Sequence, residues 1–251
     1  MYTTRRPMIA GPIRPPVHTL LIALALTVAL WFIPYADALT YPLRLFATFI
    51  HEGSHALAAL LTGNHVLGLR VAPNGGGATY TTSGNLISGM LVASAGYLGT
   101  MAYGTLLLAL LRRAVAPATI LAGSAAVVLA LTVLYGFPSP FTLAAGVLLA
   151  LGLVAAARYA GPRLAGFLVG FLAVQCVVDA LFDLRTLLAI SAPFAPSAHS
   201  DAAIMAQLTG IPALFWALLW TGLALAMLAA ALRAYAGERR VATSRPMPSP
   251  R

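Results

Sequence analysis

Seven long apolar runs divide the chain, and short polar or Pro- and Gly-rich stretches separate them. A helix needs about 20 apolar residues to cross the hydrocarbon core of a bilayer, and these runs have about that length. The pattern predicts an all-α polytopic membrane protein with about six to seven transmembrane helices. They are expected over residues 17–34, 41–62, 86–111, 114–135, 141–157, 162–188 and 211–235.

The helical pattern is interrupted between Gly63 and Gly84. Two short segments, residues 66–71 and 78–82, flank the turn-forming sequence Pro73-Asn74-Gly75-Gly76-Gly77. This arrangement predicts a β-hairpin directly after the second helix. An open strand edge there could hold a peptide by strand addition, and a plain interfacial loop is the alternative interpretation.

The third apolar run contains small residues at helical spacings. Such residues let two helix backbones approach closely in lipid. We therefore expect this helix to pack against the second one through its small positions, which are Gly89, Ala93, Ala95, Gly96, Gly99, Thr100 and Gly104.

Composition agrees with a membrane protein. The chain is 60% hydrophobic and 8% charged, whereas a soluble domain carries about a quarter charged residues. Its net charge of +9 comes from arginine alone, and most of the arginines lie between the apolar runs and at both ends. This distribution is typical of juxtamembrane charge, so we expect a lipid bilayer as partner and no nucleic acid.

Orientation follows from the same arginines. The positive-inside rule places the C-terminus in the cytoplasm, in a multi-pass protein of a bacterial-type cell membrane. Seven full spans would then leave the N-terminal arginines outside, which conflicts with the same rule.

The first run also resembles a signal peptide, with Ala36-Asp37-Ala38 as a possible cleavage site. Its length favours an uncleaved anchor, but the N-terminal topology stays open.

The second apolar run contains His51, Glu52 and His55 in an H-E-x-x-H pattern. Residues four apart share one helix face, so the two imidazoles can bind one metal ion. Glu52 stands where zincins place the carboxylate that activates a metal-bound water. Ionisable groups in an apolar helix are costly, which makes them a functional-site hypothesis. The pattern predicts a Zn²⁺ site.

A hydrolytic zinc site usually has three protein ligands, and the chain has only six acidic residues from which to take the third. Asp37 lies in a short loop and Glu238 in the C-terminal tail. The remaining candidates are Asp179 and Asp183 in the sixth apolar run, with Asp201 in the connection after it.

Two aspartates on one membrane helix need partners, because each costs roughly 2.5–3.5 kcal/mol in lipid. We expect one of Asp179 and Asp183 on the metal. The other would orient a histidine or pair with Arg185. We interpret His199 and Asp201 as a lid or loop-capping pair, with Asp201 capping residues 202–208 if they are helical.

The motifs together resemble the site-2 protease family of intramembrane zinc metallopeptidases, in its compact branch without a large extramembrane insert. The similarity covers most of residues 45–220. It rests on His51 to Leu57, Thr62-Gly63, the Gly-rich hairpin, Ala95 to Gly99, Ala180 to Leu184, His199 to Ala202 and Ile211 to Ala213.

The resemblance implies that a late helix supplies an aspartate ligand. Members carry an asparagine- and proline-containing stretch that ends in Asp-Gly. Here Gln175 precedes Asp183 by eight residues, which is the separation between the asparagine and the aspartate in those members. The prolines are absent, and Leu184 replaces the glycine. The resemblance therefore favours Asp183 as the third ligand, with Asp179 as the alternative.

The resemblance further implies an intramembrane zinc metalloendopeptidase that cuts membrane-embedded substrate proteins, with Glu52 as general base. The alternative is a zinc-binding membrane protein with a transport, structural or scaffold role. We assign residues 1–16 to a disordered basic N-terminus, 17–235 to a single transmembrane metallopeptidase-like domain, and 236–251 to a disordered Arg/Pro-rich tail.

Overall fold

The computed structural model describes residues 22, 25, 26, 29, 37–82, 84–137, 139–190 and 200–243. Most of the predicted first helix and the whole predicted N-terminal segment lie outside these residues. So do residues 244–251 of the predicted tail, and His199. Residues 236–243, predicted to be part of a disordered tail, instead continue the last helix.

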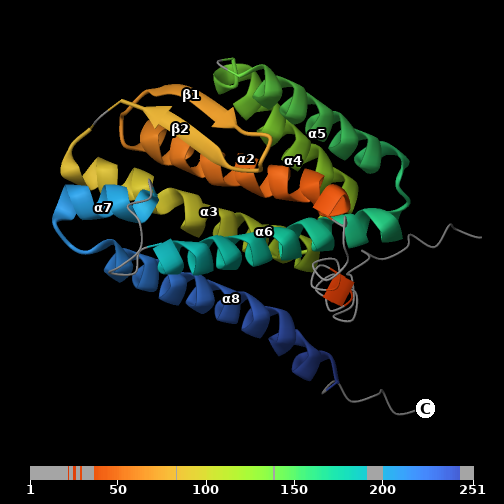
Figure 1. The fold of residues 1–251 in the computed structure, drawn as a ribbon. Helices are drawn as coiled ribbons and strands as arrows, with labels where there is room; N and C mark the ends of the chain where they lie inside the picture. Colours follow the sequence, from red (N-terminus) through yellow and green to blue (C-terminus); the bar gives the residue numbers. More distant parts are fainter. Residues whose placement is uncertain are drawn as a thin grey trace, which may run out of the picture.

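The described chain consists of helices and one hairpin (Figure 1), which confirms the predicted fold class. Most element boundaries agree with the apolar pattern to within a few residues. In order, the elements are α2 (Asp37–Leu61), β1 (Val66–Val71), β2 (Gly77–Thr81), α3 (Leu86–Arg112), α4 (Pro117–Tyr135), α5 (Pro140–Tyr159), α6 (Pro162–Ile190), α7 (Asp201–Thr209) and α8 (Ala213–Thr243).

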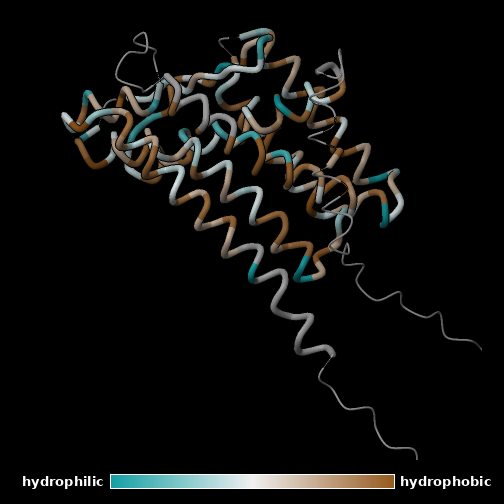
Figure 2. Tube along the Cα trace, turned by 60° about the horizontal axis from the view of Figure 1, so that its bottom comes forward, coloured by the Kyte–Doolittle hydropathy of each residue, from teal (hydrophilic) through white to brown (hydrophobic). Residues whose placement is uncertain are grey.

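Among the described residues, five helices are long and apolar enough to cross a membrane. They are α3, α4, α5, residues 162–181 of α6 and residues 213–230 of α8. Figure 2 shows that hydrophobic residues dominate the long helices. Helix α2 is 25 residues long but is not one of the five, because it carries the polar residues of the H-E-x-x-H pattern.

Helix α2 lies at the centre of the fold, between the hairpin and α3 (Figure 1). The middle of α2 is enclosed on its apolar side: Phe46 and Phe49 are among the largest buried side chains. They belong to a core shared with β1, α3, α4, α5 and α6. A second core joins α3, α6, α7 and α8 around Met101 and Trp220. Helix α3 contributes to both cores and connects them.

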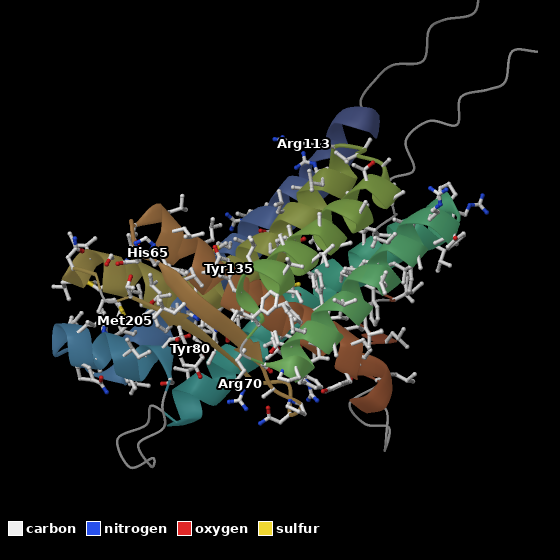
Figure 3. All side chains as sticks on the ribbon, turned by 90° about the horizontal axis from the view of Figure 1, so that it is seen from above. His65, Arg70, Tyr80, Arg113, Tyr135 and Met205 are labelled. Carbon is white, nitrogen blue, oxygen red and sulfur yellow. The ribbon has the colours of Figure 1, made fainter. Side chains whose placement is uncertain are left out.

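The two strands pair in antiparallel register, with Leu69 opposite Thr79 and Val71 opposite Gly77. Leu69 and Val71 are buried, while Arg70 and Tyr80 are exposed, and Figure 3 shows Arg70 and Tyr80 beside the hairpin. The alternation means that one face of the hairpin packs on the helices and the other is exposed.

Side-chain hydroxyls anchor the hairpin to the helices. Tyr41 Oη donates to the carbonyl of Pro73 at 2.7 Å, and Thr48 Oγ1 donates to the carbonyl of Gly75 at 2.7 Å. On the other side, Thr142 Oγ1 accepts from the backbone N–H of Val71 at 2.8 Å. The strands are therefore held in place relative to both α2 and α5.

Candidate metal centre

Helix α2 presents His51 and His55 on one face, as the spacing predicts. Their ring centroids are 4.9 Å apart, with the ring planes at 72°. The His55 side chain is buried, and 15% of the His51 side chain is exposed. Glu52, between them in the chain, is buried as well. Three polar side chains therefore gather inside the protein within one turn of helix.

A backbone carbonyl sets the tautomer of His55. Its Nδ1 lies 2.6 Å from the carbonyl oxygen of Val92 in α3. A carbonyl can only accept a hydrogen bond, so Nδ1 must carry the proton. In the neutral ring, the lone pair is then on Nε2. Fixing one ring nitrogen in this way orients the other toward a metal.

An aromatic stack supports His51. The Tyr97 ring meets the His51 ring nearly edge-on, with centroids 4.8 Å apart. Trp220 of α8 packs on Tyr97 at 5.5 Å, and its indole N–H donates to Ser94 Oγ at 3.2 Å. Helix α8 therefore braces the metal-binding face of α2 through α3.

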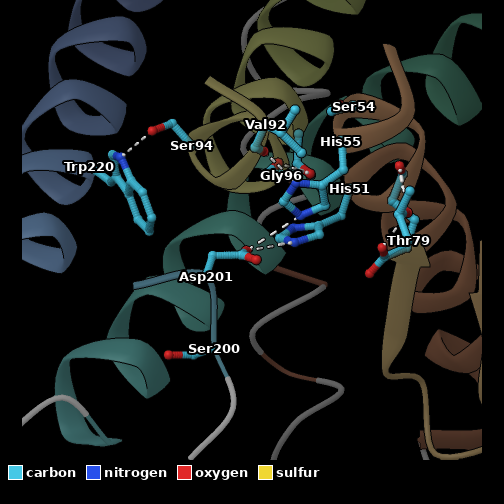
Figure 4. Close-up of polar contacts among 12 residues, drawn as sticks. His51, Ser54, His55, Thr79, Val92, Ser94, Gly96, Ser200, Asp201 and Trp220 are labelled. Carbon is cyan, nitrogen blue, oxygen red and sulfur yellow. Dashed lines mark hydrogen bonds and ion pairs between the residues drawn. The ribbon is translucent and has the colours of Figure 1, made fainter. Parts of the chain in front are cut away.

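The carboxylate that meets the histidines is that of Asp201. Its Oδ2 lies 3.5 Å from His51 Nε2 and 3.4 Å from His55 Nε2 (Figure 4). The three ligand atoms all lie within 4.8 Å of one another, and this is the one such group among the described residues. The carboxylate comes from the first turn of α7, about 150 residues after the histidines.

Our prediction that Asp201 caps this helix is wrong. Ser200 is the N-cap residue, and its Oγ accepts from the backbone N–H of Ala203 at 3.2 Å. Because Ser200 satisfies that donor, the carboxylate of Asp201 is available to the histidines. Ala202 and Met205 fix the helix by packing in the second core.

The two aspartates that the sequence favoured as the third ligand, Asp179 and Asp183, lie on α6. The structure does not describe the side chain of Asp183, so its role as a ligand stays a prediction. Asp179 is not part of the group around the histidines. Its Oδ1 accepts a hydrogen bond from Gln175 Nε2 at 2.9 Å within α6.

Asp201 is ionised in this arrangement. Burial alone would raise the pKa of its carboxyl, but the hydrogen bonds and charges of His51 and His55 outweigh burial and hold the pKa below its ordinary value. The site is thus an ionised carboxylate facing two histidine side chains.

A glycine of α3 makes room for the ligand atoms. A Cβ atom at Gly96 would overlap Nε2 of both His51 and His55. Three residues further along α3, a Cβ at Gly99 would overlap Ser54 Oγ. Gly96 and Gly99 therefore pack against α2, as predicted, and Gly96 also borders the site. Gly89 and Gly104, predicted to do the same, face Leu208 of α7 and Cys176 of α6 instead.

Glu52 lies against the hairpin. Its Oε2 accepts a hydrogen bond from Thr79 Oγ1 of β2 at 2.6 Å, and Figure 4 shows Thr79 on the strand next to α2. A Cβ at Gly77 would overlap Glu52 Oε1.

His65 is exposed at the entry to the hairpin and does not join the site. Its position is that of a solvated loop histidine.

The donor set suits a divalent transition metal. Two imidazole nitrogens and one carboxylate oxygen make up a ligand set found in catalytic zinc sites. The tautomer of His55 and the missing side chain at Gly96 both leave the space between the ligand atoms free for an ion. The residues therefore fit a metal.

Comparison with protein families identifies a match. A family model described as Peptidase M50B-like matches residues 9–231. No curated protein matches the chain, and no solved structure does.

Proposed function

Because the chain belongs to the Peptidase M50B-like family, we propose that it is an intramembrane zinc metalloendopeptidase. The family supports a metallopeptidase, and the apolar helices support an integral membrane protein. Zinc, the residue roles and the substrates are our proposal.

One observation carries the proposal: His51, His55 and Asp201 bring three ligand atoms within 4.8 Å of one another, and Glu52, which lies between the two histidines in α2, is buried as well. A structural zinc site is closed by four protein ligands, whereas a catalytic one has three and an open position. Three ligands with an adjacent carboxylate favour catalysis over a structural role.

We assign His51, His55 and Asp201 as the residues that hold Zn²⁺. When bound, zinc supplies Lewis-acid chemistry, lowering the pKa of a water toward about 7 and polarising the substrate carbonyl. Glu52 is the general base: its carboxylate takes the proton from the attacking water. It then gives that proton to the leaving amine as the peptide bond breaks.

The substrate would be a membrane protein whose cleaved segment is extended. Val71 N–H is bonded to Thr142, so Val71 and Gly77 form a pair without mutual hydrogen bonds. Hydrogen-bonded and non-hydrogen-bonded pairs alternate along an antiparallel ladder, so Leu69 and Thr79, two residues further along, are also a pair without mutual hydrogen bonds. The N–H and C=O groups of Gly77 and Thr79 then point away from β1, to the edge of β2 that pairs with no described strand. An extended substrate segment can pair there.

The same proposal covers location. The bilayer surrounds the apolar helices, and the arginine distribution favours a cytoplasmic C-terminus in a bacterial-type cell membrane. No nucleic acid is expected as a partner.

The test uses purified full-length protein in liposomes. The reporter substrate is a single Leu/Ala transmembrane helix interrupted by Gly and Pro, with a quenched fluorophore pair and products identified by mass spectrometry. Wild type should cleave it, and Glu52→Gln should bind zinc normally but cleave at least about 100-fold more slowly. Equal cleavage by Glu52→Gln, or zinc-loaded wild type that leaves the reporter intact, contradicts the proposal.

A further inference from the structure

We propose that Thr79 of β2 is a positioning residue for Glu52, so that the strand offered to the substrate also holds the general base. This inference rests on the proposed function. It adds a residue that is separate from the H-E-x-x-H pattern and from the metal ligands.

The contact itself is short and directed. Thr79 Oγ1 lies 2.6 Å from Glu52 Oε2 and 3.0 Å from the Glu52 backbone carbonyl oxygen. A hydroxyl has one proton, and the shorter approach is to the carboxylate. A distance of 2.6 Å is typical of a charge-assisted O–H···O⁻ hydrogen bond. This bond restricts the torsions of a side chain that otherwise has three rotatable bonds.

The strand also shapes the space around the second carboxylate oxygen. Gly77 stands two residues before Thr79, on the same face of β2. A side chain at Gly77 would overlap Oε1, Cγ and Cδ of Glu52. The carboxylate is therefore bonded at one oxygen by Thr79 and closely approached by backbone at the other.

The strand can act as a fixed support because it is itself held. The hairpin turn is bonded to α2 through Tyr41 and Thr48, and β1 is bonded to Thr142 of α5. Leu69, which pairs with Thr79, is fully buried. The position of the Thr79 hydroxyl therefore follows from contacts at the turn end and in the middle of the hairpin.

This geometry links substrate docking to catalysis. The backbone of Thr79 faces the open edge of β2, while its side chain faces Glu52. A peptide that pairs with this backbone would therefore contact the same residue that holds the general base. Loss of the hydroxyl should leave peptide pairing intact, since pairing uses backbone groups, but should release the carboxylate from its productive position.

The experiment compares Thr79→Val, Thr79→Ala and Thr79→Ser with wild type in the liposome assay. Valine keeps the β-branched shape without the hydroxyl, and serine keeps the hydroxyl. We expect Val and Ala to lower kcat by about 10- to 100-fold while KM and bound zinc stay at the wild-type level. Serine should restore most of the lost kcat. Thr105→Val, a matched substitution on α3 where Thr105 bonds only its own helix at Ala102, should cleave as wild type.

Two outcomes overturn the inference: wild-type kcat in both Thr79→Val and Thr79→Ala, or an equal loss of kcat in Thr79→Ser and Thr79→Val. If Thr79→Val does not fold in the membrane, Thr79→Ala alone provides the variant without the hydroxyl. Glu52→Gln is measured in parallel. If wild type cleaves and Glu52→Gln does not, the proposed function stands whichever result Thr79 gives.

Discussion

The Nδ1 atom of His55 lies 2.6 Å from the carbonyl oxygen of Val92, although the two residues belong to different helices. The carbonyl is on α3, at the turn that ends with Gly96. One turn of α3 thus holds a histidine through its backbone and makes room for the ligand nitrogens by lacking a side chain. The candidate metal site therefore depends on α3 as much as on α2.

The first prediction concerns Gly96. In Gly96→Ala the new methyl would overlap Nε2 of His51 and His55, so we expect the affinity for zinc to fall by about 10- to 100-fold. Zinc titration with a competing chelator measures this. Gly123→Ala is the matched control, because a Cβ there meets nothing within 4 Å. Equal zinc affinity in the two variants would show that Gly96 is not needed for the site.

The second prediction concerns the third ligand. Asp201→Asn should lower zinc affinity at least about 10-fold, because it removes the charged oxygen that faces both imidazoles. Asp179→Asn should leave zinc affinity unchanged, since its carboxylate is bonded to Gln175. Metal analysis of the purified variants decides, with Asp183→Asn measured alongside. Zinc lost from Asp183→Asn and kept in Asp201→Asn would return the assignment to Asp183.

The third prediction concerns pH. Histidine binds metal only when its ligand nitrogen is unprotonated, so lowering the pH should release zinc. The pKa of Asp201 is held below its ordinary value by the two histidines, so its carboxylate stays ionised while they take up protons. Zinc release should therefore follow histidine protonation, with about two protons bound per ion lost. Counting protons and zinc together during acidification checks this; release only near pH 3 would contradict it.

The fourth prediction concerns the brace formed by α8. Trp220 is almost completely buried, stacks on Tyr97 and bonds to Ser94. Trp220→Ala should lower the free energy of unfolding by about 3–5 kcal/mol, through the cavity it leaves. Phe215→Ala on the same helix is the control, because Phe215 is half exposed. Thermal unfolding in detergent compares them, and similar losses in both variants would argue against a bracing role for Trp220.

Much of the site is local in sequence and could be predicted from it. His51, Glu52 and His55 share one helix, so their spacing alone puts the imidazoles together. The hairpin was predictable because Pro73 and the three glycines after it leave the chain few other options. The small residues of α3 predicted close packing on α2, and Gly96 and Gly99 provide it.

The third carboxylate was not predictable in the same way. Asp179 and Asp183 were favoured because a charged side chain in an apolar helix is energetically costly without a partner. That argument concerns the free energy of burial and does not say where in space the carboxylate lies. The useful signal was the pair Ser200-Asp201 at a helix start. Both residues are good caps, and sequence alone could not tell that Ser200 takes this role and leaves Asp201 available.

The fold class, the hairpin and the grouping of the two histidines with Glu52 thus follow from local patterns in the chain, because apolar run length, turn chemistry and helical spacing each act over short stretches. The tertiary structure decided which carboxylate faces the histidines. That choice depends on how α7 packs between α3 and α8, 150 residues away from the motif. Packing over such a separation is fixed by the whole core and leaves no local pattern in the chain.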